Sequence, residues 1–299
     1  MLKRTIFFSK PSRLNLKDNQ LVINLTETSE LRSVPIEDIG FVVVENMQVS
    51  ITLPLLSALN ENNIAVVFCN EKHMPSSMLL NLDSNNIQGE LFSQQIAASE
   101  PLKKQLWKQT VEQKITNQSA FLKKLGFNYK DLYILANEVK SGDTDNREGV
   151  AARLYWPRLF GKEFVRDRYG EPPNPLLNYG YIILRAAVAR ALAGSGLLST
   201  LGIFHKNRYN AFCLADDIME PYRPWVDEAV YKIWNSEGGR SELNTQLKMK
   251  LLEILTADVE IGKNMRPLMV ALSQTSASLA RCFAGDSKKI QYPDFKHTI

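Results

Sequence analysis

The spacing of apolar residues changes character once along this chain of 299 residues, at the polar cluster formed by residues 83–86. Before the cluster, β-branched runs and alternating apolar residues predict strands, with one helix where leucines recur at helical spacing over residues 51–62. After it, apolar residues recur at the spacing of amphipathic helices. We therefore expect an α+β protein, with a small β-rich domain over residues 1–85 and a larger all-α domain over residues 86–299.

The first domain is expected to contain a hairpin and several buried strands. Leu14 and Leu16 precede a polar centre at residues 17–20, and Leu21 and Ile23 follow it, which is typical of two strands joined by a tight turn. The expected strands lie at residues 4–9, in both arms of 13–24, and at 34–36, 40–44, 64–68 and 78–82.

The β-branched runs of this domain also predict an interface. They supply more apolar surface than a domain of this size easily covers, so we expect the β-domain to form a homodimer interface. The residues concerned are Val42, Val43, Val44, Val66, Val67 and Phe68.

In the second domain we expect a set of helices and a polar tail. A nearly continuous apolar, alanine-rich helix over residues 178–193 is followed by glycines at positions 194 and 196, which favour helix termination. The tail from Gly285 is polar and is expected to be mobile. The other expected helices lie at residues 93–125, at 130–139, from 146 onward, at 242–256 and at 268–283.

Composition limits the class of protein. No apolar run approaches the roughly 20 residues that span a membrane, and the first ten residues have too short an apolar stretch for a signal peptide. Cys69, Cys213 and Cys282 are scattered, as expected for reduced thiols in a cytoplasmic protein. The balance of charge is −2 over residues 1–85 and +6 over residues 86–299, which favours a polyanion partner for the second domain.

Chemistry is concentrated in the stretch from residue 202 to residue 228, where several carboxylates and His205 alternate with apolar residues. Two carboxylates about 5 Å apart at the edge of a core repel by roughly 3 kcal/mol at an effective dielectric near 20. Either arginines, here Arg208 and Arg223, or a divalent cation must offset that repulsion.

Asp217 and Glu220 share a face if this segment is helical. Pro221 must break the helix, and Pro224 is expected to start the next one, so Glu220 lies at a kink. A metal site and a solvated face paired with Arg223 both remain open from this segment alone. A lone histidine such as His205 is more often structural than a ligand, although its unperturbed pKa near 6.5 would leave it neutral and able to bind metal at pH 7.

Glu148 has two interpretations. It lies three residues after Asp145 at a helix start, the spacing of a capping box, and from this segment alone capping is the favoured interpretation. The alternative is a metal ligand, with room beside the carboxylate left by the small Ala152 on the same face.

The motifs taken together resemble a known family. Glu-Gly-x-Ala-Ala-x-x-Tyr-Trp at residues 148–156, Asn-x-Leu-Leu-Asn-Tyr-Gly-Tyr at 174–181, Gly-x-x-His at 202–205 and Asp-Asp-x-Met-Glu-Pro-Tyr-Arg-Pro-x-Val-Asp at 216–227 occur in one order. This set is similar to that of the CRISPR-associated spacer-acquisition integrases, the Cas-one family, with no departure at the motif positions. The length and the wording at 216–224 look most like type II systems.

The resemblance implies a metal-dependent DNA endonuclease and integrase that joins the 3′-hydroxyl ends of a short prespacer duplex into the CRISPR repeat array by transesterification. It implies that Glu148, His205 and Glu220 are the catalytic residues and hold a divalent metal, with Asp217 beside it. One imidazole with carboxylates suits Mg²⁺ or Mn²⁺. It also implies a homodimer, two dimers being bridged by a small partner, Cas-two, with other type II adaptation proteins as further partners.

Basic and amide side chains crowd these motifs and are the candidates for binding DNA phosphates. For each, the alternative is an intramolecular partner for a neighbouring carboxylate. Four aromatic residues, Tyr155, Tyr179, Tyr181 and Trp225, could stack on bases, although core packing is favoured for most. The phosphate candidates are Lys206, Asn207, Arg208, Asn210 and Arg223.

Two other functions compete with the integrase. One is a non-catalytic DNA-binding scaffold, in which Arg208 and Arg223 lock the acidic cluster. The other is a phosphohydrolase acting on small nucleotides, which the absence of a nucleotide-cradling glycine loop disfavours.

Overall fold

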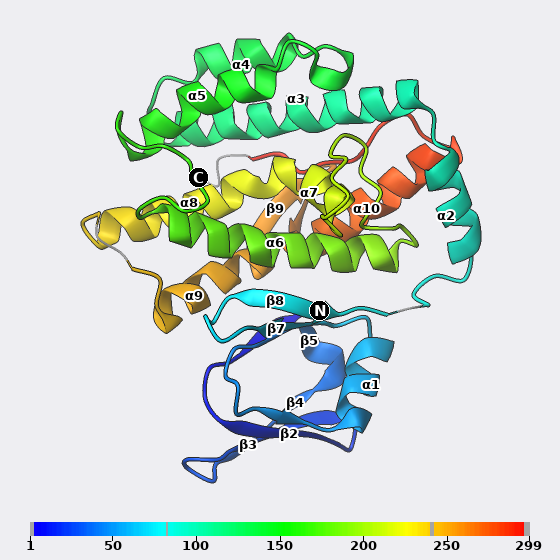
Figure 1. Ribbon diagram of the computed structural model, residues 1–299, viewed down its shortest axis with the longest axis vertical. Coiled ribbons are helices and arrows are strands. Elements are labelled where there is room, and N and C mark those ends of the chain that lie inside the picture. The colour runs from blue at the N-terminus through cyan, green and yellow to red at the C-terminus, as the bar shows by residue number, and fades with distance from the viewer. Residues whose placement is uncertain (1–2, 82, 240–241, 296–299) are drawn as a thin grey trace. The chain divides into compact units, whose positions relative to one another are not determined.

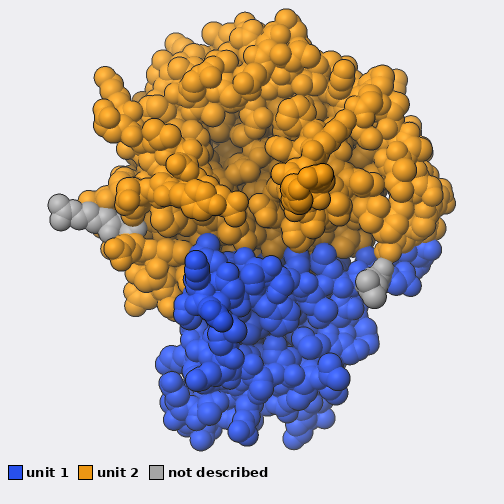
Figure 2. Space-filling model, in the orientation of Figure 1, with its two compact units in different colours: residues 1–86 blue, residues 87–299 orange. Residues whose placement is uncertain are grey.

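The computed structural model describes residues 3–81, 83–239 and 242–295. It divides into two compact units, residues 1–86 and residues 87–299, which Figure 2 shows in two colours. Each unit is described by itself below. The expected strand over 78–82 and the end of the expected tail reach residue 82 and residues 296–299, which lie outside the described residues.

Unit 1 contains two four-stranded sheets and one helix, α1 (Leu53–Glu61) (Figure 1). The first sheet has parallel pairs β1–β5 and β5–β7, with β8 antiparallel at its edge. Its strands are β1 (Arg4–Phe8), β5 (Ile39–Val44), β7 (Ala65–Cys69) and β8 (Pro75–Leu79). The second sheet has the order β4 (Leu31–Pro35), β3 (Gln20–Leu25), β2 (Ser12–Lys17) and β6 (Ser50–Ile51), and the 3₁₀ turn η1 (Ile36–Asp38) follows β4.

Most predicted strands of unit 1 are present, but the one expected over 78–82 lies at 75–79, and β6 was not predicted. The hairpin turn lies where the polar centre predicted it. Asp18 and Asn19 both have positive φ, 50° and 56°, as a two-residue turn between β2 and β3 requires. Strand β5 is buried along its whole length, which explains its uninterrupted apolar sequence. The β-branched residues proposed for dimerisation are buried in the single chain, and Phe68 is partly buried, so the dimer interface stays a prediction.

Unit 2 is mainly helical. Its α-helices are α2 (Gln88–Ala97), α3 (Glu100–Lys124), α4 (Lys130–Asn137), α5 (Arg147–Phe160), α6 (Asn174–Gly194), α7 (Cys213–Met219), α8 (Arg223–Ser236), α9 (Thr245–Leu252) and α10 (Leu268–Ala284). Three 3₁₀ turns, η2 (Ser141–Asp143), η3 (Glu220–Tyr222) and η4 (Glu253–Thr256), connect some of them. Helix α6 packs against α7, α8, α9 and α10 and is the central helix of the unit (Figure 1).

Helix α6 bears on the expectation that no apolar run is long enough to span a membrane. It is long and apolar enough to cross a membrane by length and composition, although 72% of its most apolar window is buried inside the protein. A close approach explains one of its motif residues: a Cβ at Gly180 would lie 2.5 Å from Val226 Cγ1, so glycine lets α6 and α8 pack together.

Three other expectations for unit 2 were wrong. The single helix expected over residues 93–125 is two helices, because Ser99 caps the start of α3 through its bond from the Leu102 amide. The unit is not all-helical, since β9 (Asp258–Ile261) and β10 (Asn264–Pro267) form a hairpin. The tail packs against α3, where Tyr292 Oη lies 2.8 Å from Thr110 Oγ1 and both residues are buried.

Candidate active site

The site is formed where three elements of unit 2 bring charged side chains together. Lys114 lies on α3, Glu148 lies in the first turn of α5, and Glu220 begins η3. The break predicted at Pro221 is confirmed, because α7 ends at Met219 and α8 begins at Arg223. This break places Glu220 between two helices rather than along a helix surface.

The start of α5 shows that Glu148 is not a capping residue. Asn146 is the N-cap and accepts a hydrogen bond from the Gly149 amide at 3.1 Å. Asp143 accepts bonds from the amides of Arg147, at 2.8 Å, and of Glu148, at 3.1 Å. The capping-box interpretation with Asp145 is therefore wrong, and the Glu148 carboxylate is left for another partner.

That partner is Lys114. Its Nζ lies 2.5 Å from Glu148 Oε1 and 2.6 Å from Glu220 Oε2, so one ammonium bridges the two carboxylates. Arg223 Nε lies 2.8 Å from the same Glu220 oxygen. Burial opposes charge on Glu220, but Arg223 and Lys114 together lower its pKa to about 2. Both cations therefore keep the buried glutamate ionised.

His205 is positioned by Asp217. The Asp217 carboxylate is fully buried and accepts the backbone amides of Ile203, at 2.7 Å, Phe204, at 3.0 Å, and His205, at 3.2 Å. The His205 ring nitrogen Nδ1 lies 2.5 Å from Asp217 Oδ1. This hydrogen bond raises the pKa of His205, and burial raises the pKa of Asp217. With Nδ1 engaged by the carboxylate, Nε2 is the ring nitrogen left to bind a ligand.

The loop that carries His205 requires a glycine. A Cβ at Gly202 would lie 2.4 Å from the His205 carbonyl oxygen and 2.8 Å from Asp217 Oδ2, which no side chain tolerates. Trp107 supports the same loop by stacking on Phe204, with ring centroids 4.2 Å apart, and by an edge contact with His205 at 5.8 Å. The Gly-x-x-His spacing therefore has a steric reason.

The predicted ligands thus share one region, but they do not yet surround a common point. As the side chains stand, the described residues contain no group of three histidine, cysteine or acidic residues arranged to hold a metal ion. Lys114 instead lies between Glu148 and Glu220, and both glutamates are near enough to His205 to raise its pKa.

A groove of about 490 Å³ opens beside His205 and is lined by three basic side chains, Lys103, Lys206 and Arg208. Lys206 lies 3.3 Å from Glu100, and the Arg208 guanidinium lies over the Tyr209 ring at 4.6 Å from its centroid. These exposed contacts can exchange for phosphate contacts at little cost, since surface ion pairs are weak.

The remaining DNA candidates have structural partners. Asn207 accepts the Tyr209 amide at 2.9 Å, and Asn210 donates to Asp216 at 2.7 Å. Arg223 pairs with Glu220 and lies 4.3 Å from the centroid of the Tyr181 ring. For Arg223 the intramolecular alternative is therefore the one observed.

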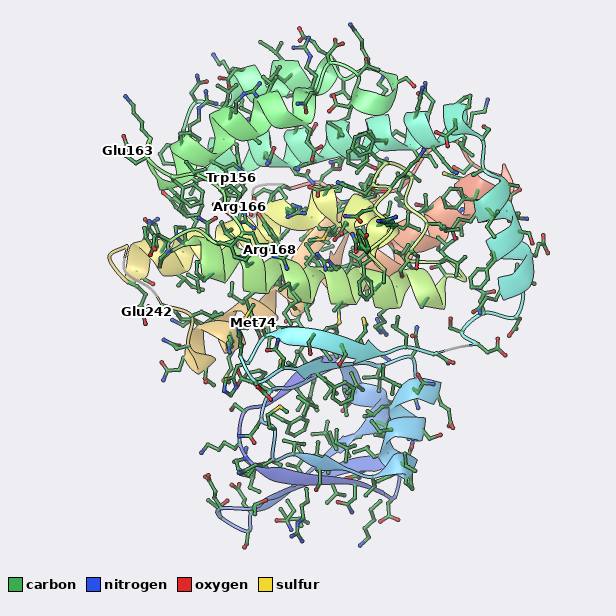
Figure 3. All side chains as sticks on the ribbon, viewed as in Figure 1. Met74, Trp156, Glu163, Arg166, Arg168 and Glu242 are labelled. Atoms are coloured by element: carbon green, nitrogen blue, oxygen red, sulfur yellow. The ribbon has the colours of Figure 1, made fainter. Side chains whose placement is uncertain are left out.

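Another buried carboxylate, Asp227, is near enough to Arg223 and Lys114 for both charges to lower its pKa. Asp227 is fully buried and accepts hydrogen bonds from the hydroxyls of Tyr155, at 2.8 Å, and Tyr181. Burial raises its pKa to about 6, although both hydroxyl bonds oppose the rise. Arg166, in the segment between α5 and α6 (Figure 3), lies 5.4 Å from the centroid of the Tyr181 ring. The aromatic residues proposed for base stacking are buried here, as core packing predicted.

The sequence reasoning missed Lys114 and Trp107. Both lie on the face of α3 that also carries the buried residues Thr110 and Val111. A lysine at a position of this apolar stripe is itself a signal, because lysine is almost never buried unless it is paired.

The comparisons with known proteins settle the family. Residues 6–252 match the family described as "CRISPR associated protein Cas1". The CRISPR-associated endonuclease Cas1 of Neisseria meningitidis is 37% identical over 297 residues, covering 98% of this chain and 97% of that protein. The chain belongs to the Cas1 family. The resemblance seen in the motifs, the Cas-one family, is confirmed.

Solved structures of similar fold include a casposase and a complex that contains Cas1. A casposase bound to its integration product has a TM-score of 0.80 at 21% identity, covering 100% of this chain and 94% of that one. A Cas6-RT-Cas1–Cas2 complex has a TM-score of 0.71 at 18% identity, covering 97% of this chain and 36% of that one. At these identities they show that this Cas1-family chain shares their fold.

Proposed function

We propose that this chain is a nuclease and integrase of CRISPR adaptation, which joins the 3′-hydroxyl ends of short prespacer DNA to the repeat array. Two findings support the proposal: membership in the Cas1 family, whose relative in N. meningitidis is named an endonuclease, and the fold shared with a casposase. The single observation that carries it is that Glu148 and Glu220 both contact one side-chain ammonium, that of Lys114. Both glutamates are also near enough to His205 to raise its pKa.

We propose that Glu148, Glu220 and His205 hold Mg²⁺ or Mn²⁺. The residues fit such an ion, because two carboxylates already contact one positive charge and His205 Nε2 is left for a ligand. When bound, the ion would stabilise the charge that develops on the phosphoryl oxygens. Asp217 orients the His205 ring, and Arg223 holds Glu220 in its ionised form.

The proposed reaction needs no covalent enzyme intermediate. The prespacer 3′-oxygen forms a new bond to phosphorus, the bond from phosphorus to the repeat's own 3′-oxygen breaks, and the proton passes from the attacking hydroxyl to the leaving oxygen through solvent. With water as the nucleophile the same site cuts DNA. The basic groove beside His205 would hold the phosphates that fix the register of both strands.

We propose DNA and a Cas2 protein as partners, because similar folds occur in solved complexes with both. The homodimer rests on the family resemblance alone, since the valines of β5 and β7 are buried in the single chain. A sedimentation measurement at micromolar concentration tests it: we expect a dimer, and a monomer would contradict the proposal.

The test of function is strand transfer. Purified protein, its Cas2 partner, a prespacer duplex and a repeat target should give joined products with Mg²⁺ or Mn²⁺ and none with chelator. Specific DNA binding without any joined or cut product in either metal would contradict the proposal.

One observation favours a second candidate, the non-catalytic scaffold. Lys114 and Arg223 together neutralise the glutamates without any metal, as a purely structural cluster would require. A scaffold would bind DNA equally with and without chelator and would never join strands.

A further inference from the structure

Lys114 is placed unusually for a lysine. Its side chain is 11% exposed, and its ammonium contacts one oxygen of each glutamate, at 2.5 Å and 2.6 Å. The partner on α5 is 34 residues away along the chain. Removing an ammonium from water costs free energy, and its contacts with both carboxylates must offset that cost.

A divalent ion at the same point would compete with this ammonium. The ion needs the oxygens that Lys114 contacts, and two like charges cannot share them in a partly buried site. Glu220 also has Arg223, at 2.8 Å, so it keeps a cation if Lys114 moves away. Arg223 does not pair with Glu148, so Glu148 depends more than Glu220 on the Lys114 ammonium for a positive partner.

We propose that Lys114 is a positioning residue that occupies the cation position between Glu148 and Glu220 in the metal-free protein and is displaced when the metal binds. It keeps the two carboxylates close together before the ion arrives, and it weakens metal binding because it must first be moved. The proposal rests on the proposed function, since it assumes that a metal binds to these glutamates.

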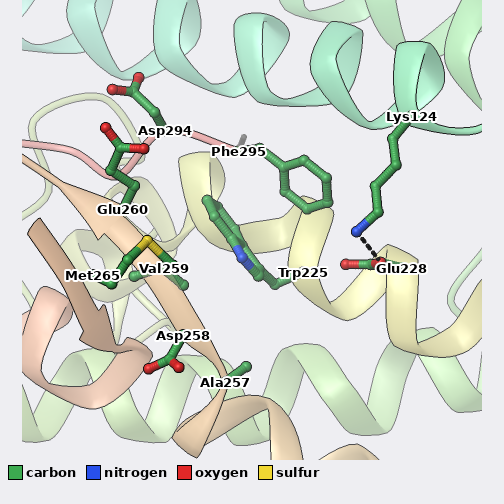
Figure 4. A pocket seen from close by; sticks show the side chains of 10 residues that line it. All are labelled: Lys124, Trp225, Glu228, Ala257, Asp258, Val259, Glu260, Met265, Asp294 and Phe295. Atoms are coloured by element: carbon green, nitrogen blue, oxygen red, sulfur yellow. Dashed lines mark hydrogen bonds and ion pairs between the residues drawn. The ribbon is translucent and has the colours of Figure 1, made fainter. Parts of the chain in front are cut away.

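The experiment compares Mn²⁺ affinity in the wild type and in two matched lysine variants by following free Mn²⁺ with electron paramagnetic resonance. Lys114→Met keeps the length of the stem and removes the charge. Lys124→Met is the control, because Lys124 lies on the same helix with its ammonium 2.8 Å from Glu228, at a pocket lined by Trp225 and Phe295 (Figure 4).

We expect Lys114→Met to lower the Kd for Mn²⁺ by about tenfold, because charge-assisted contacts no longer compete with the ion. Lys124→Met should leave the Kd unchanged. In chelator, Lys114→Met should melt at a lower temperature than Lys124→Met, and Mn²⁺ should remove most of that difference. An unchanged or raised Kd in Lys114→Met would overturn the role of Lys114.

If Lys114→Met does not fold, Lys114→Arg keeps the charge and should bind Mn²⁺ no more tightly than the wild type, whereas tighter binding would overturn the proposal. A wild type that binds no Mn²⁺ contradicts the proposed function itself. A wild type that binds Mn²⁺ with no response to the loss of Lys114 contradicts only the present inference.

Discussion

Asp217 does more for the site than its predicted place beside the metal suggested. Its carboxylate is fully buried. It accepts the three backbone amides of residues 203–205 and contacts the His205 ring. The neighbouring Asp216, in contrast, pairs with Arg185 at 2.7 Å. Two adjacent carboxylates of one motif therefore have different tasks, because Asp217 is buried whereas Asp216 is the one residue of α7 that is partly exposed.

We expect Asp217→Asn to weaken both the fold and metal binding. An amide cannot accept all four hydrogen bonds, so the free energy of unfolding should fall by roughly 2–3 kcal/mol. Loss of the partner that orients His205 should weaken Mn²⁺ binding by about 10- to 100-fold. Urea denaturation and Mn²⁺ titration measure the two effects. Glu112→Gln is the control, because Glu112 pairs with Lys108 on the surface of α3. Normal stability with normal affinity would remove Asp217 from the site.

Asp227 predicts a pH dependence of stability. Burial raises its pKa from 3.8 to about 6, so between these values the folded protein holds a proton that the unfolded chain has lost. Stability from this group therefore falls as pH rises from about 4 to about 6, by at most roughly 3 kcal/mol, and is constant above that range. Asp227→Asn should remove this part of the slope in urea denaturation. An identical slope in wild type and variant would show that Asp227 stays ionised.

At the scale of elements, the sequence predicted what is set by local sterics. The proline at position 221 imposed the break that places Glu220, and the alternation around residues 17–20 imposed the hairpin of unit 1. The cap of α5 was misjudged, because Asp143 and Asn146 compete for the same amides as the expected Asp145. No local pattern specifies which of several acidic residues captures a helix start.

The hairpin of β9 and β10 was missed for a related reason. Its strands are four residues each and stand between helical patterns, and its turn residues Gly262 and Lys263 adopt positive φ, 55° and 72°, without the usual Asn-Gly signal. The tail was missed because its apolar residues, Ile290, Tyr292 and Phe295, are too widely spaced to mark an element, yet all are buried.

The loop at residues 202–205 yields a prediction at this scale. Gly202→Ala should displace the loop, because the new methyl group would meet the backbone oxygen of His205 at 2.4 Å. We expect strand joining to fall by at least roughly 100-fold, since misplacing a reacting group by about 1 Å has that effect. Gly89→Ala is the control, as a Cβ there meets nothing within 4 Å. Equal joining rates in the two variants would show that the position of His205 does not matter.

At the scale of the whole molecule, charge indicates where DNA binds. The excess of +6 lies after residue 85, and the groove beside His205 presents Lys103, Lys206 and Arg208. The sequence predicted the region but not the separate contacts, because pairings such as that of Lys206 with Glu100 span 106 residues of chain.

DNA affinity should therefore fall steeply with salt. Replacing Lys206 and Arg208 together by alanine should reduce the magnitude of the log–log salt slope by about 1.8, since each lost phosphate contact contributes about 0.9. Lys232→Ala should leave the slope unchanged, because Lys232 is exposed on α8 and does not line this groove. Fluorescence anisotropy with a labelled duplex measures all three slopes. A double variant with the wild-type slope would place the DNA elsewhere.

Glu148→Gln shows whether Glu148 holds the metal that drives strand joining. The amide still accepts a hydrogen bond from Lys114 but is a poor ligand for a hard cation. Glu228→Gln, which alters another lysine-paired glutamate, is the matched control.

With Mg²⁺ or Mn²⁺ present, the account predicts that Glu148→Gln joins prespacer ends about 100- to 1000-fold more slowly than Glu228→Gln, because the metal contributes several kcal/mol to the transition state. Its melting temperature and DNA affinity should stay close to those of the control. If a normally folded Glu148→Gln variant joins DNA at the rate of the control, Glu148 does not hold the metal.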